Sequence, residues 1–599
     1  MKRVRGIAVS HGIATGKALV ISRWESDLPR YRIAAEDVRS ELRRFWKARS
    51  QAREEIGALR EKAARELGDK YAAIFDAHLM ILDDRSLGRE TMGRIRDGLL
   101  NAEWALAKTV KRLLAAFAGM EDPYIRERGG DVSDVHTRLQ RILALESNRE
   151  EGALDLEEDT VIVAPSLLPS DALWLHQPHI VAFVTEQGSR TSHTAILANA
   201  LEIAAVLGAE GVTEVVQQGD EVIVDGFHGT VIVAPTAEEK ASRLKERERL
   251  LQLEAAFEQD RGPVRTTDGV ELVLRGNVEF PEEMKTLRRV GATGVGLYRS
   301  EFLFLTTAPR LPDEEQHFEA YCRIAREAEG APVVIRTLDL GGEKYFHDVL
   351  ESGEANPVMG LRAVRFCLKR PDIFRTQLRG LLLAAAEHPN IRVMVPMISG
   401  LEEWRAVRMM VSRTREELES EGRTIPPVPL GPMIEIPSAA LMADALARES
   451  DFFSIGTNDL QQYTLAVDRG NRSVAYLNDP CHPAVLRLLR ETILAARRRK
   501  IPISLCGEMA SDPLGALTLL GMGLREFSCN PAMVSEIRSI LRRCSERAAR
   551  RVVSEAMELA TGQEIRARLE EAFSGLLEAV LGPSLTEDTW GEDRNPGVR

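Results

Sequence analysis

The most constraining feature of the sequence is a regular alternation of short apolar segments with helical segments in its C-terminal half. After Pro263, eight strand-like segments are separated by stretches that have helical periodicity. Eight successive strand–helix units over about 300 residues are typical of a TIM barrel. The predicted strands are ELVLRGNVE, GVGLYRSEF, VVIRTLDL, RVMVPMI, PLGPMIEIP, FFSIGTNDL, PISLCGE and EFSCN.

Polar residues occur late in these predicted strands. The carboxyl ends of the strands in such a barrel meet at one mouth, where the chemistry of this fold takes place. Charges scattered at random over a surface would not share this position, so we expect the side chains to converge. They are Arg299, Glu301, Arg336, Asp339, Glu435, Asn458, Asp459 and Glu508.

The positively charged residues of this set are all arginines. Arg299, Arg336 and, just beyond the sixth strand, Arg469 offer planar donors suited to phosphate and carboxylate. Arg362 is a fourth candidate, from the segment after the third strand. The alternative is that these residues form structural salt bridges around the barrel rim.

Two acidic residues on neighbouring strands, Glu435 and Asp459, provide hard oxygen ligands for a Mg²⁺ ion shared with a substrate phosphate. Cys506, in LCGE, ends the seventh strand, and its thiol could exchange a proton with carbon as an enolate forms or collapses. An inert buried thiol is the alternative. The six cysteines include no CxxC pair, which indicates a reducing compartment and no structural zinc.

A second constellation is GSRTSHTAILANAL, residues 188–201. A predicted strand leads into a turn, Thr191 and Ser192 are candidate helix caps, and His193 lies in the first helical turn. A helix start favours a neutral imidazole and negative charge on a group attached to it. Such a ring can attack phosphorus and form a phosphoramidate. The alternative is a histidine with an ordinary hydrogen bond near a helix cap.

The N-terminal half divides into further regions. Residues 33–146 have long amphipathic helical runs, whereas short β-branched runs begin at Thr160, and a charged helix is predicted over 237–259. Two short strands, RGIAVS and KALVIS, joined by a turn at HGIATG, open the chain and could join the later sheet. The expected regions are an α/β domain (1–24 with 150–236), a helical insertion (25–149), a connecting helix (237–262), the barrel (263–580) and a tail (581–599).

Charge and hydropathy exclude several classes of function. A net charge of −12 argues against a nucleic-acid partner, which would require a basic surface. No segment approaches the roughly 20 apolar residues of a membrane span, and the N-terminus lacks a secretory signal. We therefore expect a cytoplasmic protein.

Several long motifs resemble enzyme I of the bacterial sugar phosphotransferase system. They cover nearly the whole chain in the same order, and the TNDLQQYTLAVDRGN block is highly specific. The motifs are GIAVSHGIATGKAL, GSRTSHTAILA, GVGLYRSEFLF, VVIRTLDLGGEK, NPVMGLRAVR, DFFSIGTNDLQQYTLAVDRGN and LCGEMASDPL. The resemblance implies a swivelling α/β phosphohistidine domain with an inserted helical bundle, followed by a C-terminal TIM barrel.

The resemblance also implies a reaction and its residues. The protein would autophosphorylate from phosphoenolpyruvate with Mg²⁺ (Mn²⁺ being possible) and pass the group to the phosphocarrier HPr. The helical insertion would dock HPr, and the barrel would form a homodimer. His193 would be phosphorylated and Cys506 would protonate the enolate. Arg299, Arg336, Asn458 and Arg469 would hold the phosphate with Arg362 nearby, and Glu435 and Asp459 would hold the metal, Asp459 also lying at the substrate.

Three departures from the family pattern surround the histidine, namely Ser189, Asn199 and Leu168. A pyruvate phosphate dikinase or phosphoenolpyruvate synthase shares the histidine motif, but only about 150 residues precede that region here, without a phosphate-binding Gly-rich loop. The remaining alternatives are a paralogue that serves a regulatory carrier and a non-catalytic regulatory homologue.

Overall fold

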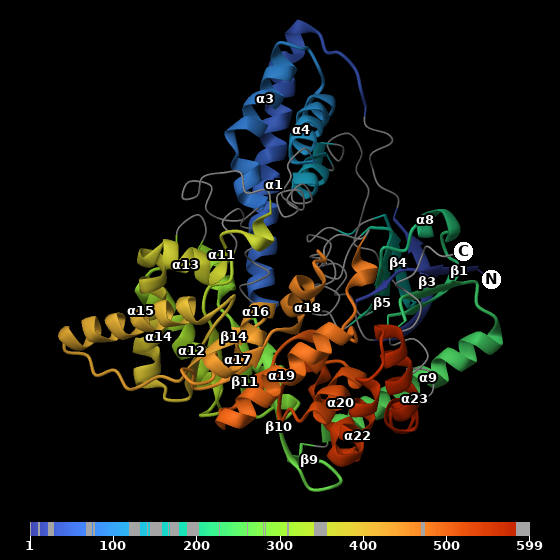
Figure 1. The fold of residues 1–599 in the computed structure, drawn as a ribbon. Helices are drawn as coiled ribbons and strands as arrows, with labels where there is room; N and C mark the ends of the chain where they lie inside the picture. Colours follow the sequence, from blue (N-terminus) through green and yellow to red (C-terminus); the bar gives the residue numbers. More distant parts are fainter. Residues whose placement is uncertain are drawn as a thin grey trace. The chain divides into compact units, whose positions relative to one another are not determined.

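The structure is a computed structural model in which the chain forms two compact units, Met1–Leu251 and Gln252–Arg599 (Figure 1). The described residues are 2–9, 12–21, 29–66, 75, 78–118, 132–140, 142–143, 158–165, 167, 179–187, 203–226, 228–259, 261–279, 281, 283–307, 311–340, 356–468 and 474–582.

The second unit contains a closed barrel of eight parallel strands, which confirms the predicted TIM barrel. Each strand pairs with the next in sequence, and the last strand pairs with the first to close the ring. All eight predicted segments contribute a strand. These are β10 (Glu271–Val278), β11 (Val295–Arg299), β12 (Val333–Arg336), β13 (Ile391–Val395), β14 (Leu430–Ile434), β15 (Phe453–Ile455), β16 (Ile503–Leu505) and β17 (Glu526–Cys529). A short strand, β9 (Val264–Arg265), pairs antiparallel with β10 and was not predicted.

Helices surround the barrel. Sequence signals explain where several begin: Asp313 and Gln316 form a capping box, and proline occupies the first turn of others. Inside the ring, apolar side chains from neighbouring strands pack together, including Val334, Met394 and Met433. The helices are α10 (Glu283–Arg289), α11 (Glu301–Thr307), α12 (Glu314–Glu327), α13 (Ala363–Lys369), α14 (Pro371–Glu387), α15 (Leu401–Ser420), α16 (Pro437–Leu441), α17 (Ala443–Leu446), α18 (Thr457–Leu465), α19 (Pro483–Arg499), α20 (Pro513–Met522), α21 (Val534–Arg543), α22 (Glu546–Ala556) and α23 (Gly562–Leu581).

The first unit contains an eight-stranded mixed sheet in the order β1-β8-β7-β3-β4-β5-β6-β2. The chain contributes three strands to this sheet before the helical region and five after it. The expected turn at HGIATG is wrong in part, because β3 already begins at Ile13 and pairs with β7 from that residue. The strands are β1 (Lys2–Arg5), β2 (Ile7–Ala8), β3 (Ile13–Val20), β4 (Thr160–Ala164), β5 (Ile180–Thr185), β6 (Ala204–Leu207), β7 (Glu221–Asp225) and β8 (Thr230–Val233); the short helix α8 (Val212–Val215) follows β6.

Three long helices lie between β3 and β4 in sequence, namely α1 (Val38–Glu66), α3 (Arg85–Arg96) and α4 (Ala102–Ala118). They share a separate apolar core that includes Phe45, Ile56, Leu82 and Leu106. Arg44 donates to Glu103 at 2.6 Å and so joins α1 to α4. The predicted helical character of this region is confirmed for its described residues.

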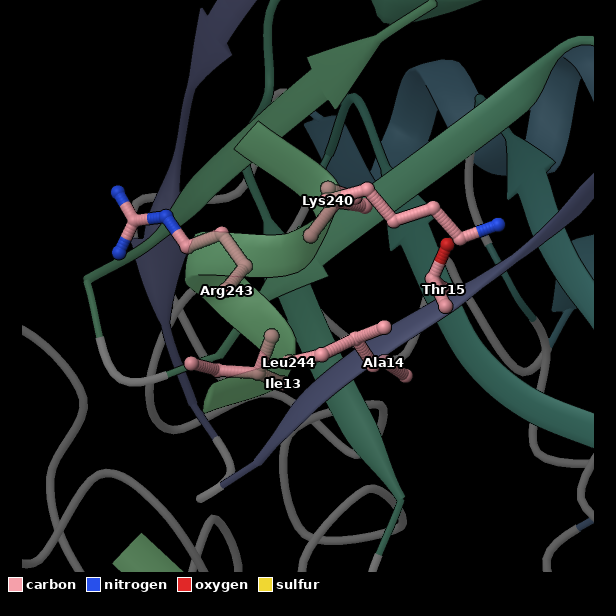
Figure 2. A pocket seen from close by; sticks show the side chains of 7 residues that line it. Ile13, Ala14, Thr15, Lys240, Arg243 and Leu244 are labelled. Atoms are coloured by element: carbon pink, nitrogen blue, oxygen red, sulfur yellow. The ribbon is translucent and has the colours of Figure 1, made fainter. Parts of the chain in front are cut away.

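The predicted charged helix is α9 (Ala237–Gln259), which follows β8. Its first turns pack on the sheet, where Leu244 lies against Ile13 and Ala14 and lines a small pocket (Figure 2). Arg243 forms an ion pair with the fully buried Asp225 at 3.1 Å. The beginning of α9 is therefore tied to the sheet of the first unit. Within the described ranges of the chain, helices that combine membrane-spanning length with sufficient apolar character are absent.

Candidate active site

The predicted functional residues of the barrel lie at the carboxyl ends of its strands. Arg299 and Arg336 are the last residues of β11 and β12, and Glu435 and Cys506 directly follow β14 and β16. Asp459 lies in the first turn of α18, which begins two residues after β15. Because parallel strands bring these ends to one mouth, the sequence prediction of a converging polar set is consistent with the fold.

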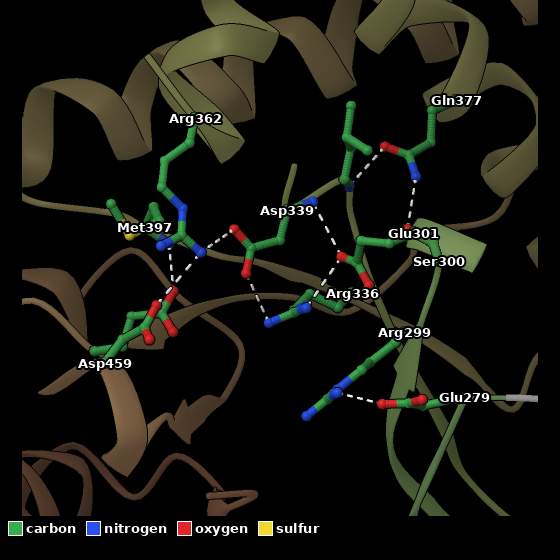
Figure 3. A network of polar contacts seen from close by, with 12 residues as sticks. Glu279, Arg299, Ser300, Glu301, Arg336, Asp339, Arg362, Gln377, Met397 and Asp459 are labelled. Atoms are coloured by element: carbon green, nitrogen blue, oxygen red, sulfur yellow. Dashed lines mark hydrogen bonds and ion pairs between the residues drawn. The ribbon is translucent and has the colours of Figure 1, made fainter. Parts of the chain in front are cut away.

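Arg336 is the centre of a buried charge network (Figure 3). Its guanidinium lies 3.1 Å from Glu301 Oε1 and 2.9 Å from Asp339 Oδ2. The backbone N–H of Asp339 also donates to Glu301 Oε1, at 3.0 Å. Burial opposes the charge of Arg336, but the surrounding carboxylates Glu301 and Asp339 outweigh it and raise the pKa of Arg336. The arginine is held as a fixed cation.

Arg362, the residue before α13, extends this network across the mouth. Its Nη2 donates to Asp339 Oδ1 at 2.8 Å and lies 3.5 Å from Asp459 Oδ2. Nη1 donates to the hydroxyl of Tyr463 at 3.3 Å, and that hydroxyl donates to the backbone oxygen of Val358 at 2.6 Å. Both oxygens of Asp339 are therefore engaged by arginines. Burial favours the neutral acid, yet Arg336 and Arg362 hold the pKa of Asp339 below its ordinary value.

Glu435 is a buried acid that lies near two other carboxylates. Only 2% of it is exposed, and its Oε1 accepts the backbone N–H of Met397 at 2.6 Å. Burial and the nearby carboxylates Asp459 and Asp339 raise the pKa of Glu435 to about 8. Gly456 lets the Glu435 carboxylate lie close to the backbone after β15, since a Cβ at position 456 would lie 2.7 Å from Glu435 Oε2.

The donor set at the mouth fits a hard divalent cation. Both oxygens of Asp339 are engaged by arginines, whereas Asp459 has Arg362 at 3.5 Å and Glu435 accepts a backbone N–H through Oε1. The carboxylates of Glu435 and Asp459 are therefore the candidate oxygen donors. Mg²⁺ commonly uses one or two carboxylates and completes its shell with water and substrate phosphate. A cation would also reduce the repulsion that raises the pKa of Glu435.

The remaining described candidates have different surroundings. Arg299 forms an ion pair with Glu279, and both side chains are about half exposed. Asn458 donates to Glu508 Oε1 at 3.0 Å, and the backbone N–H of Glu508 donates to Asn458 Oδ1 at 3.1 Å. These contacts join the first turn of α18, after β15, to the short 3-10 helix that follows β16. Among the described arginines of the mouth, Arg299 is therefore more exposed to solvent than Arg336 and Arg362.

Cys506 contributes to the apolar layer inside the ring, with 6% of it exposed. The hydroxyl of Ser454 donates to its sulfur at 3.4 Å, and the thiol lies 3.6 Å from the backbone oxygen of Ile455. Burial is the main reason that the pKa of Cys506 is raised, so the thiol is protonated at neutral pH.

Sequence reasoning missed one buried residue that supports the mouth. Gln377, on α14, accepts the backbone N–H of Leu338 at 3.0 Å and donates to Ser300 Oγ at 3.1 Å and Tyr321 at 3.0 Å. Its position in the middle of a helix carries no strand-end signal. Glu301 and Asp339 were recognised by their phase, but their role in holding Arg336 follows only from the contacts.

Two of the candidates, His193 and Arg469, lie outside the described residues. The same holds for Leu168, Ser189 and Asn199, which depart from the family pattern. Their expected roles therefore remain predictions.

Three family models match successive parts of the chain. Residues 5–128 match the N-terminal region of PEP-utilising enzymes, 156–229 their mobile domain, and 254–546 their PEP-binding domain. The barrel and its mouth thus correspond to the PEP-binding domain of that class of enzyme.

Full-length relatives narrow this class further. Proteins of Bacillus sp. (strain S) and Geobacillus stearothermophilus, both named phosphoenolpyruvate-protein phosphotransferase, are each 40% identical over 577 residues, or 96% of this chain and 98% of theirs. A Bacillus subtilis protein of the same name is 38% identical over 96% of this chain and its own full length. The chain belongs to the phosphoenolpyruvate-protein phosphotransferase family, that of enzyme I, and is a phosphotransferase.

Proposed function

We propose that the protein transfers the phosphoryl group of phosphoenolpyruvate to His193 and then to an HPr-type phosphocarrier protein. The observation that carries this proposal is the buried network in which Arg336 and Arg362 flank Asp339, beside Glu435 and Asp459. Fixed guanidinium groups suit a small dianion or trianion, and the oxygen donors suit a metal that binds its phosphate.

In the first step, the guanidinium groups hold the substrate. Arg299, Arg336 and Arg469, with Asn458, bind the phosphate, while Arg362 lies close enough to assist. Arg336 is preorganised by its two acids, so little reorganisation accompanies the increase of charge in the transition state. Arg299, being half exposed, can exchange Glu279 for substrate.

Glu435 and Asp459 would hold Mg²⁺, with Mn²⁺ as a possible substitute, and Asp459 would also border the substrate. When bound, the metal neutralises phosphate charge and orients the phosphoryl group. Because the pKa of Glu435 is about 8 in the metal-free site, part of its population must lose a proton before it becomes a ligand at neutral pH.

The bond changes balance without a further reactant. The neutral imidazole of His193 attacks phosphorus, an N–P bond forms, and the bond between phosphorus and the enol oxygen breaks. The enolate that leaves takes a proton at its methylene carbon from Cys506 and becomes pyruvate. The raised pKa of Cys506 supports this role, since the thiol carries its proton at neutral pH.

The second transfer requires His193 to leave the barrel mouth. His193 and the barrel belong to different units of the chain, and α9 runs across the boundary between them at Leu251. We therefore retain the five regions expected from the sequence, with 1–24 and 150–236 as a swivelling domain and 25–149 as the docking region for HPr. A homodimer formed through the barrel and a cytoplasmic location belong to the same proposal.

Incubation with phosphoenolpyruvate labelled in its phosphate tests the reaction. With Mg²⁺, the wild type should acquire an acid-labile label, and His193→Ala should acquire none. Adding purified HPr should remove the label from the wild type. Label that depends on ATP would indicate a dikinase, and no label under any condition would indicate a non-catalytic regulator; either result overturns the proposal. Label that only another carrier removes would replace HPr by a regulatory partner.

A further inference from the structure

A cluster of three potential metal ligands lies at the opposite end of the barrel from the mouth. Cys322 is on α12, Glu387 is the last residue of α14, and His388 follows it, shortly before β13 begins at Ile391. One ligand atom from each residue lies within 4.8 Å of the other two. Because His388 precedes its strand, the cluster lies at the amino-terminal end of the strands, where TIM barrels do not place their catalytic groups.

The backbones of α12 and α14 are held together beside this cluster (Figure 1). Gly380 makes the close approach possible, since a Cβ there would lie 2.5 Å from the Cβ of His317. Asn390 donates to the backbone oxygens of Ala325 and Ala331, at 3.2 and 2.8 Å. The end of α14 is thereby fastened to the end of α12, so the proximity of Cys322 to His388 does not depend on flexible surface side chains.

The histidine has an unsatisfied atom. Within the described part of the chain, His388 Nε2 is buried and has no hydrogen-bond partner. A buried polar nitrogen without a partner costs about 1–3 kcal/mol. The sulfur of the cluster belongs to Cys322, which is only 3% exposed, whereas Glu387 is exposed to solvent.

We propose that Cys322, Glu387 and His388 form a binding site for a zinc-class divalent cation. Thiolate, imidazole and carboxylate are the ligands that zinc takes in proteins, and a set of three leaves the fourth position to water. Ligand atoms around tetrahedral zinc lie about 3.3–3.8 Å apart. The three ligand atoms lie within 4.8 Å of one another without an ion, so small movements of the side chains would bring them to that separation. Mg²⁺, which requires oxygen donors, does not fit this set.

Binding would exchange a proton for the cation. Burial and the negative charge of Glu387 raise the pKa of the Cys322 thiol to about 11, while Arg326 acts in the opposite direction. The thiol proton leaves to solvent as the sulfur becomes a ligand. The bound ion would join α12 to α14, the two long helices that flank β12 in sequence, and Arg336 ends that strand.

Titration of the full-length, chelator-treated protein with Co²⁺ tests the site. Saturating Mg²⁺ is present to occupy the mouth. The wild type should bind one Co²⁺ per chain with thiolate-to-cobalt charge-transfer absorption, and Zn²⁺ should displace it. Cys322→Ser should lose the absorption, and Glu387→Gln and His388→Gln should each weaken binding about tenfold or more. Zn²⁺ at about 100 times its Kd should raise the Tm of the wild type by about 3 °C.

Matched variants make the result decisive. Cys544→Ser removes another buried thiol of the same unit and should leave the absorption unchanged. If Cys322→Ser folds poorly, the Co²⁺ affinity of Glu387→Gln, a change at an exposed residue, tests the site instead. The proposal is overturned if the wild type gives no thiolate absorption, or if Cys322→Ser or Glu387→Gln binds Co²⁺ as tightly as the wild type. It stands apart from the phosphotransfer reaction, because none of its readouts requires activity.

Discussion

The two ends of the barrel hold ligand sets of opposite chemical character. At the mouth, Glu435 and Asp459 offer only oxygen and lie within a network that contains Arg336 and Arg362. At the base, sulfur and nitrogen accompany a single carboxylate between two helices. If both proposed sites bind their ions, the fold separates a hard-ion site, where charge is organised for reaction, from a softer site that affects helix packing.

The largest effect is expected at the centre of the mouth. Arg336→Ala removes a preorganised cation and should lower kcat/KM for phosphoenolpyruvate by about 10³-fold or more. Arg379→Ala is a matched control, because Arg379 also bridges two acids, Glu314 and Glu421, but does so on the outer helices. Steady-state phosphorylation of the carrier measures both. Equal losses in the two variants would mean that Arg336 acts through stability alone.

The sequence predicted which residues lie at the mouth of the barrel, but not which residues lie together at its base. Strand-end phase identified Arg336, Glu435 and Asp459, because in a parallel barrel position along a strand determines which end a residue reaches. No such rule connects Cys322 on α12 with His388 after α14. Their proximity depends on the packing of two helices at Gly380, which sequence spacing does not reveal. The expectation of no structural zinc, which rested on the absence of a CxxC pair, stays a prediction, and the proposed site is the alternative to it.

A second large effect concerns the proposed metal ligand. Glu435→Gln keeps the shape of the side chain but removes its charge, so it should lower kcat by about 10²-fold and raise the Mg²⁺ concentration needed for half-maximal activity. Glu508→Gln changes a nearby but exposed carboxylate and serves as the control. Activity measured across a Mg²⁺ series distinguishes the two. An unchanged Mg²⁺ requirement in Glu435→Gln would assign the ion to other ligands.

The same residue predicts a pH dependence of stability in the metal-free protein. Glu435 has a folded-state pKa of about 8, above its ordinary 4.5, so the folded state binds the extra proton between these values. The free energy of unfolding should therefore fall as the pH rises from about 4.5 to about 8, and then level off. Glu435→Gln should remove about 1–3 kcal/mol of that fall. Thermal melts in chelator at pH 6 and pH 9 measure it, and a variant that retains the full slope contradicts the prediction.

An intermediate effect is expected for a residue that positions the mouth without touching substrate. Gln377→Leu leaves Leu338 N–H and Ser300 Oγ without their shared partner, between the ends of β12 and β11. We expect kcat to fall about tenfold while KM changes little, because Arg336 and Glu301 lose alignment. Thr518→Val, a buried change on α20 that removes only a bond to Leu514, should affect stability but not kcat. A similar loss of kcat in Thr518→Val would indicate general loosening of the barrel.

The smallest effect is expected at the base and tests whether the two ends are independent. Glu387→Gln should change phosphoenolpyruvate-dependent phosphorylation by less than about twofold, because it alters an exposed residue at the amino-terminal end of the strands. The same variant should lose about half or more of the rise in Tm that Zn²⁺ gives the wild type. Stabilisation by Mg²⁺ should persist, because the proposed Mg²⁺ ligands are the oxygen donors Glu435 and Asp459. Thermal melts with each ion, in wild type, Glu387→Gln and Glu435→Gln, separate the two sites by opposite patterns of loss. If Glu387→Gln removed the Mg²⁺ effect as well, the ends would be coupled through α14 and β12, and the contrast between a reactive and a structural end would no longer hold.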